Sequence, residues 1–176
     1  MKGIDLPSLP LSSPAFAAYG ERIRAEATDP TVAGAGFRFW DGLAGIGGET
    51  GTSVGLVRVG TAPREATVFE EHRHSAELLL PVEGPVHLLL GRGSPAQPDR
   101  PDPDRFAAFR VEPGEGALLH PRTWHRAPVA ETGTVSVWVV FASHTFQEDC
   151  HRHDTAADFI TLHLQPLPSP QPRNAL

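Results

Sequence analysis

Glycine and proline recur along this chain at short intervals, which limits the folds it can adopt. The 176 residues include 17 glycines and 18 prolines. Both residue types end helices and occupy turns, so their repeated use favours many short strands over long helices. A chain of this length suits one domain that buries a core of its own. We therefore expect an all-β protein.

Apolar segments between these residues predict the strands. Strands are expected over 52–59, 66–74, 77–82, 86–90, 106–111, 117–120, 124–129 and 134–142. The turn at Glu83-Gly84 is expected to pair 77–82 with 86–90 as a hairpin, and the bend at 121–123 to pair 117–120 with 124–129. Residues 91–104 are expected to form a loop.

One short N-terminal helix is expected, because Ser12 or Ser13 can cap it and Pro14 suits its first position. Many short strands with a single helix predict a β-barrel of the cupin or jelly-roll type. We expect residues 1–164 to form a single cupin domain and residues 165–176 a proline-rich C-terminal tail.

Charge and cysteine content exclude several classes of function. The net charge of −6 and the lack of a basic tract argue against nucleic-acid binding. Cys150 is the only cysteine, so an internal disulfide cannot form and a reducing compartment fits. No apolar stretch has the length of a membrane span or the pattern of a signal peptide. We expect a cytoplasmic protein without a membrane partner.

Two histidine-containing segments predict a metal site. His72 and His74 share a face if they lie in a strand, and Glu77 follows them. His125 would approach from the second segment. Imidazole and carboxylate ligands suit a divalent ion such as Zn, Ni, Mn or Fe. We expect His72, His74 and His125 as ligands and Glu77 as a fourth; Glu77 could instead hydrogen-bond a ligand histidine, and His74 could face solvent in a loop.

Two further residues are candidates for catalysis. His120 and His125 flank one bend, so both can reach the same pocket. We favour His125 as the ligand and His120 as a general acid or base, although His120 could be an alternative ligand or a core histidine. Arg58 shares a strand face with Val54 and Leu56. It could fix a substrate carboxylate, or it could extend to water from an edge strand.

Several segments together resemble a known family. The residues from His72 through Glu77 to Gly84, and those from Gly116 to His125, resemble the two cupin motifs. Within cupins the chain is similar to the ureidoglycolate lyase family over roughly residues 6–162. The segments that carry this likeness are 15–20, 52–58, Glu71-His72 with Leu80-Pro81 and Gly84, and His120 with Trp124-His125.

The resemblance implies a homodimeric lyase of allantoin and purine degradation. Such an enzyme releases urea from a small carboxylate substrate, ureidoglycolate, to give glyoxylate. Its chemistry would use Glu77 and His120 for proton transfer, and either Arg58 or the metal to fix the carboxylate.

Three positions depart from the family. Where this chain has His74, Glu77 and Glu83, the family usually has an apolar residue, an amide and a lysine. His74 and Glu77 favour an alternative function, a metal-dependent cupin isomerase, decarboxylase or dioxygenase that acts on another small hydroxy or keto acid. A non-enzymatic cupin that binds a small ligand is a third reading.

Overall fold

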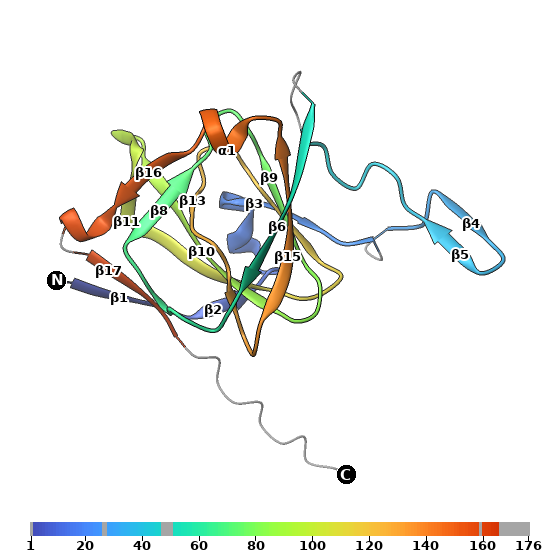
Figure 1. The fold of residues 1–176 in the computed structure, drawn as a ribbon, viewed down its shortest axis with the longest axis horizontal. Coiled ribbons are helices and arrows are strands. Elements are labelled where there is room, and N and C mark those ends of the chain that lie inside the picture. The colour runs from blue at the N-terminus through green and yellow to red at the C-terminus, as the bar shows by residue number, and fades with distance from the viewer. Residues whose placement is uncertain (1, 26–27, 47–50, 159, 166–176) are drawn as a thin grey trace, which may run out of the picture.

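Two β-sheets pack face to face in the computed structural model, which describes residues 2–25, 28–46, 51–158 and 160–165 (Figure 1). One sheet has the order β3-β12-β9-β15-β6, and the other β16-β8-β13-β10-β11-β2 with β14 beside β10. The first comprises β3 (Gly20–Ile23), β6 (Thr52–Val59), β9 (Glu77–Pro81), β12 (Gly116–Leu119) and β15 (Val135–Ala142). The second comprises β2 (Ser8–Pro10), β8 (Val68–Glu71), β10 (Val86–Ser94), β11 (Gln97–Val111), β13 (Trp124–His125), β14 (Val129–Ala130) and β16 (His151–Asp154).

Most consecutive strands from β6 onward alternate between the two sheets, as in a jelly roll. The predicted all-β class is therefore confirmed. Both expected hairpins are wrong, because β9 pairs with β12 and β15 whereas β10 pairs with β11, β13 and β14. The turn at Glu83-Gly84 and the bend at 121–123 each carry the chain from one sheet to the other.

Two apolar clusters hold the layers together. The larger lies between the two sheets and includes Leu79, Leu88, Phe109 and Val137, which are at most 2% exposed. The smaller lies on the other face of the β10–β11 sheet and contains Trp124. A third sheet covers that cluster, in the order β1 (Lys2–Leu6), β17 (Ile160–Leu164) and β7 (Glu65–Ala66). The inner face of the β10–β11 sheet is thus left to line the space between the sheets.

In the described part of the chain, the helical elements are short. The expected N-terminal helix is a 3-10 helix over Pro14–Ala18, and the Ser13 side chain accepts a hydrogen bond from the Ala15 N–H. Its Phe16 ring packs edge-on against Phe109. Two turns were not expected, α1 (Thr145–Glu148) and a 3-10 turn over Thr155–Asp158.

Several strand boundaries differ from the prediction, and the strand expected over 124–129 is divided into β13 and β14. The strand expected over 66–74 ends at Glu71, and the chain bends at Arg73 and His74. The loop expected over 91–104 is wrong, because most of it pairs as β10 and β11, with irregular register between Gly91 and Ser94. Except for Pro101, its prolines and charged residues are at least partly exposed.

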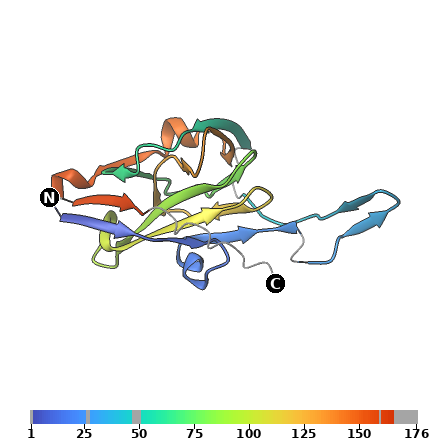
Figure 2. The same ribbon diagram turned by 90° about the horizontal axis from the view of Figure 1, so that it is seen from below.

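A two-stranded hairpin extends away from the sheets (Figures 1 and 2). It comprises β4 (Val32–Gly34) and β5 (Phe37–Phe39), which pair with each other and, among the described residues, with no other strand. Val32 and Phe39 are about half exposed. The predicted tail lies outside the described residues apart from Gln165. No helix in the described part of the chain is long and apolar enough to cross a membrane.

Candidate metal centre

Two imidazoles and a carboxylate converge between the sheets. The Nε2 atoms of His72 and His125 lie 3.2 Å and 2.9 Å from Oε2 of Glu77. All three side chains are less than 10% exposed. His72 follows β8, His125 ends β13 and Glu77 begins β9, so both sheets contribute to the cluster. The structure thereby brings together three residues that the sequence singled out.

The backbone fixes which nitrogen of each imidazole carries the proton. Nδ1 of His72 lies 2.9 Å from the carbonyl oxygen of Asp149, and Nδ1 of His125 lies 2.9 Å from that of Thr123. A carbonyl oxygen only accepts hydrogen bonds, so each Nδ1 carries a hydrogen. In the neutral imidazoles, Nε2 therefore presents a lone pair, the form that binds metals.

The lone pairs of the two Nε2 atoms face those of a carboxylate oxygen, Oε2 of Glu77. Oε2 of Glu77 is buried and receives no hydrogen bond of acceptable geometry from the described residues. A buried carboxylate oxygen beside two unprotonated nitrogens needs either a proton or a metal ion between them.

The pKa values reflect this need for positive charge. Burial alone would lower the pKa of His125, but the negative charge of the adjacent Glu77 raises that pKa to about 9. Burial alone would raise the pKa of Glu77, but His125 and then His72 lower it to about 2. The metal-free protein therefore holds an imidazolium–carboxylate pair at neutral pH.

Glu70, which the sequence analysis missed, completes a set of three possible ligands with His72 and His125. The ligand atoms of Glu70, His72 and His125 lie within 4.8 Å of one another, close enough to hold a metal ion. The Cys150 thiol donates a hydrogen bond to Oε2 of Glu70 at 3.0 Å. Burial of the thiol and, to a smaller extent, its contact with the Glu70 carboxylate raise its pKa to about 11. Nε of Arg152 lies 3.5 Å from the same oxygen. These two contacts orient the Glu70 carboxylate.

The donor set fits a divalent ion. Two imidazole nitrogens and one or two carboxylate oxygens are typical ligands of Zn, Mn, Fe and Ni sites. Oε2 of Glu77, which faces both Nε2 atoms, is available as a further ligand. The chain therefore contains a His/Glu group that could hold a metal ion.

The structure places His74 away from this group. Its side chain is exposed and borders a separate pocket with Ser143 and Glu148. Asp149 holds the bend, because its two carboxylate oxygens accept hydrogen bonds from the N–H groups of Arg73 and His74 at 2.9 Å and 2.8 Å. Since the strand has already ended, the alternation that would align His72 with His74 instead aligns Glu70 with His72.

Two other residues singled out by the sequence also lie apart. Nε2 of His120 is 3.5 Å from a carboxylate oxygen of Glu21. His120 also does not line either of the two cavities that border the His/Glu cluster, which are described below. Arg58 is exposed on the outer face of β6 with Val54 and Leu56.

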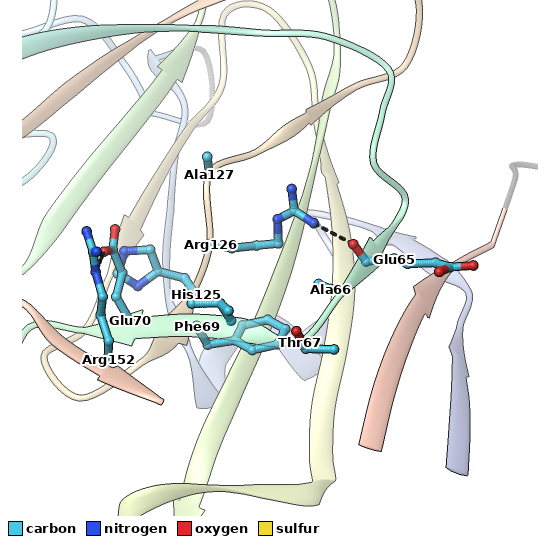
Figure 3. A pocket seen from close by; sticks show the side chains of 10 residues that line it. Glu65, Ala66, Thr67, Phe69, Glu70, His125, Arg126, Ala127 and Arg152 are labelled. Carbon is cyan, nitrogen blue, oxygen red and sulfur yellow. Dashed lines mark hydrogen bonds and ion pairs between the residues drawn. The ribbon is translucent and has the colours of Figure 1, made fainter. Parts of the chain in front are cut away.

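Two adjoining cavities open beside the cluster, and both are lined by Glu70, His125 and Arg126. One of about 290 Å3 also reaches His72 and Glu77. The other, of about 390 Å3, extends toward Glu65. Figure 3 shows the second cavity, with Glu70 and Arg152 beside the His125 ring and Arg126 directed toward Glu65.

Arg126 is a half-buried cation that the sequence analysis did not select. NH1 donates to the carbonyl oxygens of Pro63 and Glu65, and within the described residues no carboxylate forms an ion pair with it. Burial lowers the pKa of its guanidinium. Its position directly after His125 is the sequence signal that could have identified it.

Comparison with known proteins identifies the family. The family model described as ureidoglycolate lyase matches residues 4–161. The chain belongs to the ureidoglycolate lyase family. Ureidoglycolate lyases from several Escherichia coli strains are 29% identical over 128 residues, which is 69% of this chain and 78% of theirs. The resemblance read from the sequence is thereby confirmed.

Solved structures of sugar isomerases are also similar to this chain. A dTDP sugar isomerase from Desulfovibrio desulfuricans matches with a TM-score of 0.48 and 18% identity, over 80% of this chain and 85% of that one. The 3,4-ketoisomerase QdtA from Thermoanaerobacterium thermosaccharolyticum, in complex with TDP-4-keto-6-deoxyglucose, matches with a TM-score of 0.42 and 15% identity. That match covers 56% of this chain and 63% of QdtA.

Proposed function

We propose that this protein is a metal-assisted lyase that releases urea from ureidoglycolate to give glyoxylate. Membership of the ureidoglycolate lyase family supports the reaction. The observation that carries the proposal is the buried His72–His125–Glu77 cluster beside a cavity bordered by arginines. Cleavage needs the C2 hydroxyl to lose its proton and the leaving nitrogen to gain one, and such a cluster can assist both transfers.

Glu70, His72 and His125 would hold a divalent ion, with Glu77 as a further ligand or as the base. An ion there would lower the pKa of a bound substrate hydroxyl. The Zn, Ni, Mn or Fe expected from the sequence all accept this donor set.

Glu77 is our candidate for moving the proton. Its Oε2 faces the space between the two imidazoles, and its burial keeps bulk water from competing. His120 lies outside both cavities, so we assign it no step.

Arg126 and Arg152 are our candidates for binding the substrate carboxylate. They lie on either side of the His125 ring in the larger cavity (Figure 3). Arg126 is half-buried and, among the described residues, pairs with no carboxylate, so it is well suited to bind a planar anion. Arg152 is exposed and already contacts Glu70, so its contribution is the smaller one. This assignment replaces the role expected for Arg58.

We predict that Arg126→Gln lowers kcat/KM for ureidoglycolate by about a hundredfold, mainly through KM, because a charged contact to the carboxylate is lost. Arg152→Gln should have a smaller effect in the same direction. The matched control, Arg58→Gln, makes the same change on the outer face of β6 and should stay within about twofold of the wild type. Urea and glyoxylate release by the metal-loaded protein would measure this. Comparable losses in the Arg58 and Arg126 variants would contradict the assignment.

A second candidate function is a metal-dependent isomerase, decarboxylase or dioxygenase acting on another small hydroxy or keto acid. The His/Glu donor set favours it, because such a set serves many reactions of hydroxy acids. Full metal content without urea release from either enantiomer of ureidoglycolate would favour this candidate over the lyase.

We also propose that the protein is a cytoplasmic homodimer. An isolated two-stranded hairpin is marginally stable in water, so the β4–β5 hairpin needs a surface to pack on. Val32 and Phe39 on the hairpin, and Val54 and Trp138 on the outer face of β6 and β15, are between 46% and 65% exposed. A second copy would cover both apolar surfaces.

A further inference from the structure

The smaller cavity beside the His/Glu cluster has a more apolar lining than the larger one. Its charged and ionisable lining residues are those of the His/Glu cluster and Arg126, namely Glu70, His72, Glu77, His125 and Arg126. The rest of its lining is largely apolar and includes Val57, Leu79, Pro128, Val139, Phe141 and Phe146.

These apolar walls come from elements that also carry the core. Leu79 is 2% exposed and belongs to the main core cluster, against which Val57 and Val139 pack. The Phe141 ring lies edge-on to the His72 imidazole with 6.1 Å between centroids. Phe146, on α1, also borders the cavity although it is 63% exposed. A large exposed phenylalanine at a cavity rim is available to cover an apolar group.

Ureidoglycolate is poorly matched to the apolar part of the smaller cavity. A ureidoglycolate molecule whose carboxylate binds Arg126 and whose reacting carbon lies at the His/Glu cluster would place its carbamoyl group in the smaller cavity. The terminal NH2 would then bring two N–H donors against aliphatic and aromatic side chains. Donors removed from water without a new acceptor weaken binding, whereas an alkyl group in the same place gains from burial.

We propose that the preferred substrates are N-acyl-2-hydroxyglycines, in which an apolar acyl chain replaces the carbamoyl NH2. This inference rests on the proposed lyase function and changes only the leaving group. The bond between C2 and nitrogen breaks, the hydroxyl proton is transferred to the leaving nitrogen, and the products are a primary amide and glyoxylate. The reaction requires no oxidant, reductant or added water.

The cavity accommodates such a chain. Its volume of about 290 Å3 exceeds what the small carbamoyl group fills. Each methylene placed against the apolar wall should increase kcat/KM about threefold, until the chain reaches Phe146 at the rim.

The test compares ureidoglycolate with the N-acetyl, N-butanoyl and N-hexanoyl 2-hydroxyglycines on one metal-loaded preparation. Glyoxylate is a product in every case, so a single assay ranks them. We expect N-butanoyl-2-hydroxyglycine to exceed ureidoglycolate in kcat/KM by about tenfold or more. Val139→Phe, which fills the cavity, should shift the optimum to a shorter chain, and Val57→Phe provides a second variant with the same purpose.

Glyoxylate release that is fastest from ureidoglycolate, or that is independent of chain length, would overturn the inference while leaving the lyase function intact. An unchanged chain-length optimum in folded Val139→Phe and Val57→Phe would also overturn it. No glyoxylate from any of the four compounds would overturn the lyase function and this inference with it.

Discussion

At the scale of single residues, backbone carbonyls prepare the metal site. Asp149 and Thr123 accept the Nδ1 protons of His72 and His125, which leaves both Nε2 atoms directed at one point. Groups that orient a ligand histidine in this way raise its basicity and metal affinity. Both imidazoles should therefore be indispensable for binding an ion.

We predict that His72→Ala and His125→Ala each lower the affinity for a divalent ion by at least about a hundredfold, because each removes a ligand. His74→Ala is the matched control, since it removes an exposed imidazole two residues from His72. Metal content after dialysis, and titration against a competing chelator, would measure the effect. Loss of metal in the His74 variant would contradict the ligand set.

The Glu77–His125 pair predicts how the stability of the metal-free protein depends on pH. The folded pKa of His125, about 9, lies above its ordinary value of 6.5, so its stabilisation is complete below pH 6.5 and is lost as the pH rises through 9. The folded pKa of Glu77, about 2, lies below its ordinary value of 4.5. Its stabilisation is therefore present above pH 4.5 and is lost as the pH falls toward 2.

We expect the free energy of unfolding of the metal-free protein to fall by up to about 3 kcal/mol between pH 6.5 and 10. Glu77→Gln removes the carboxylate and should flatten this dependence. Urea unfolding at several pH values would measure both proteins. Parallel pH curves for the wild type and the variant would show that the pair does not contribute.

At the scale of elements, the sequence identified the strands better than their partners. Alternating and β-branched residues located β6, β9, β12 and β15 correctly, because that pattern depends on one strand and its two faces. Pairing depends on distant residues, and a turn such as Glu83-Gly84 has the same local chemistry whether it closes a hairpin or crosses between sheets. This is why both expected hairpins were wrong.

The candidate site was only partly predictable for a related reason. His72, Glu77 and His125 follow from residue type, and the structure brings them together. The placement of His74 depends on where β8 ends, and Asp149, distant in the sequence, fixes that bend. Glu70 could have been found by applying strand alternation two residues before His72 instead of two residues after it.

Asp149 should therefore control the geometry of the bend. In Asp149→Asn, one oxygen that accepts a backbone N–H becomes an amide nitrogen, so one of the two hydrogen bonds is lost. We expect a loss of about 1–2 kcal/mol in the free energy of unfolding and weaker metal binding. Glu148→Gln changes the neighbouring exposed carboxylate in the same way and should have little effect. Equal destabilisation of the two variants would contradict this role.

At the scale of the whole molecule, the β4–β5 hairpin tests the proposed dimer. Phe39→Ser removes its exposed ring and should weaken self-association by tenfold or more, because buried aromatic residues dominate protein interfaces. Ala33→Ser, on the same hairpin, is the control. Sedimentation equilibrium over a range of concentrations would measure the dissociation constant. A monomeric wild type, or a dimer unaffected by Phe39→Ser, would contradict the proposal.

The position of β17 has a consequence for how the chain folds during synthesis. This strand lies between β1 and β7, in parallel register with β1 and antiparallel to β7. Because β1 lies at the N-terminal end of the sequence and β17 near the other end, the ribosome synthesises β1 long before β17. Until residues 160–164 emerge, Leu6 and Trp124 lack the strand that covers them. The nascent chain therefore exposes an apolar, aggregation-prone surface. Chaperone capture is expected during that interval and should end once β17 has been inserted.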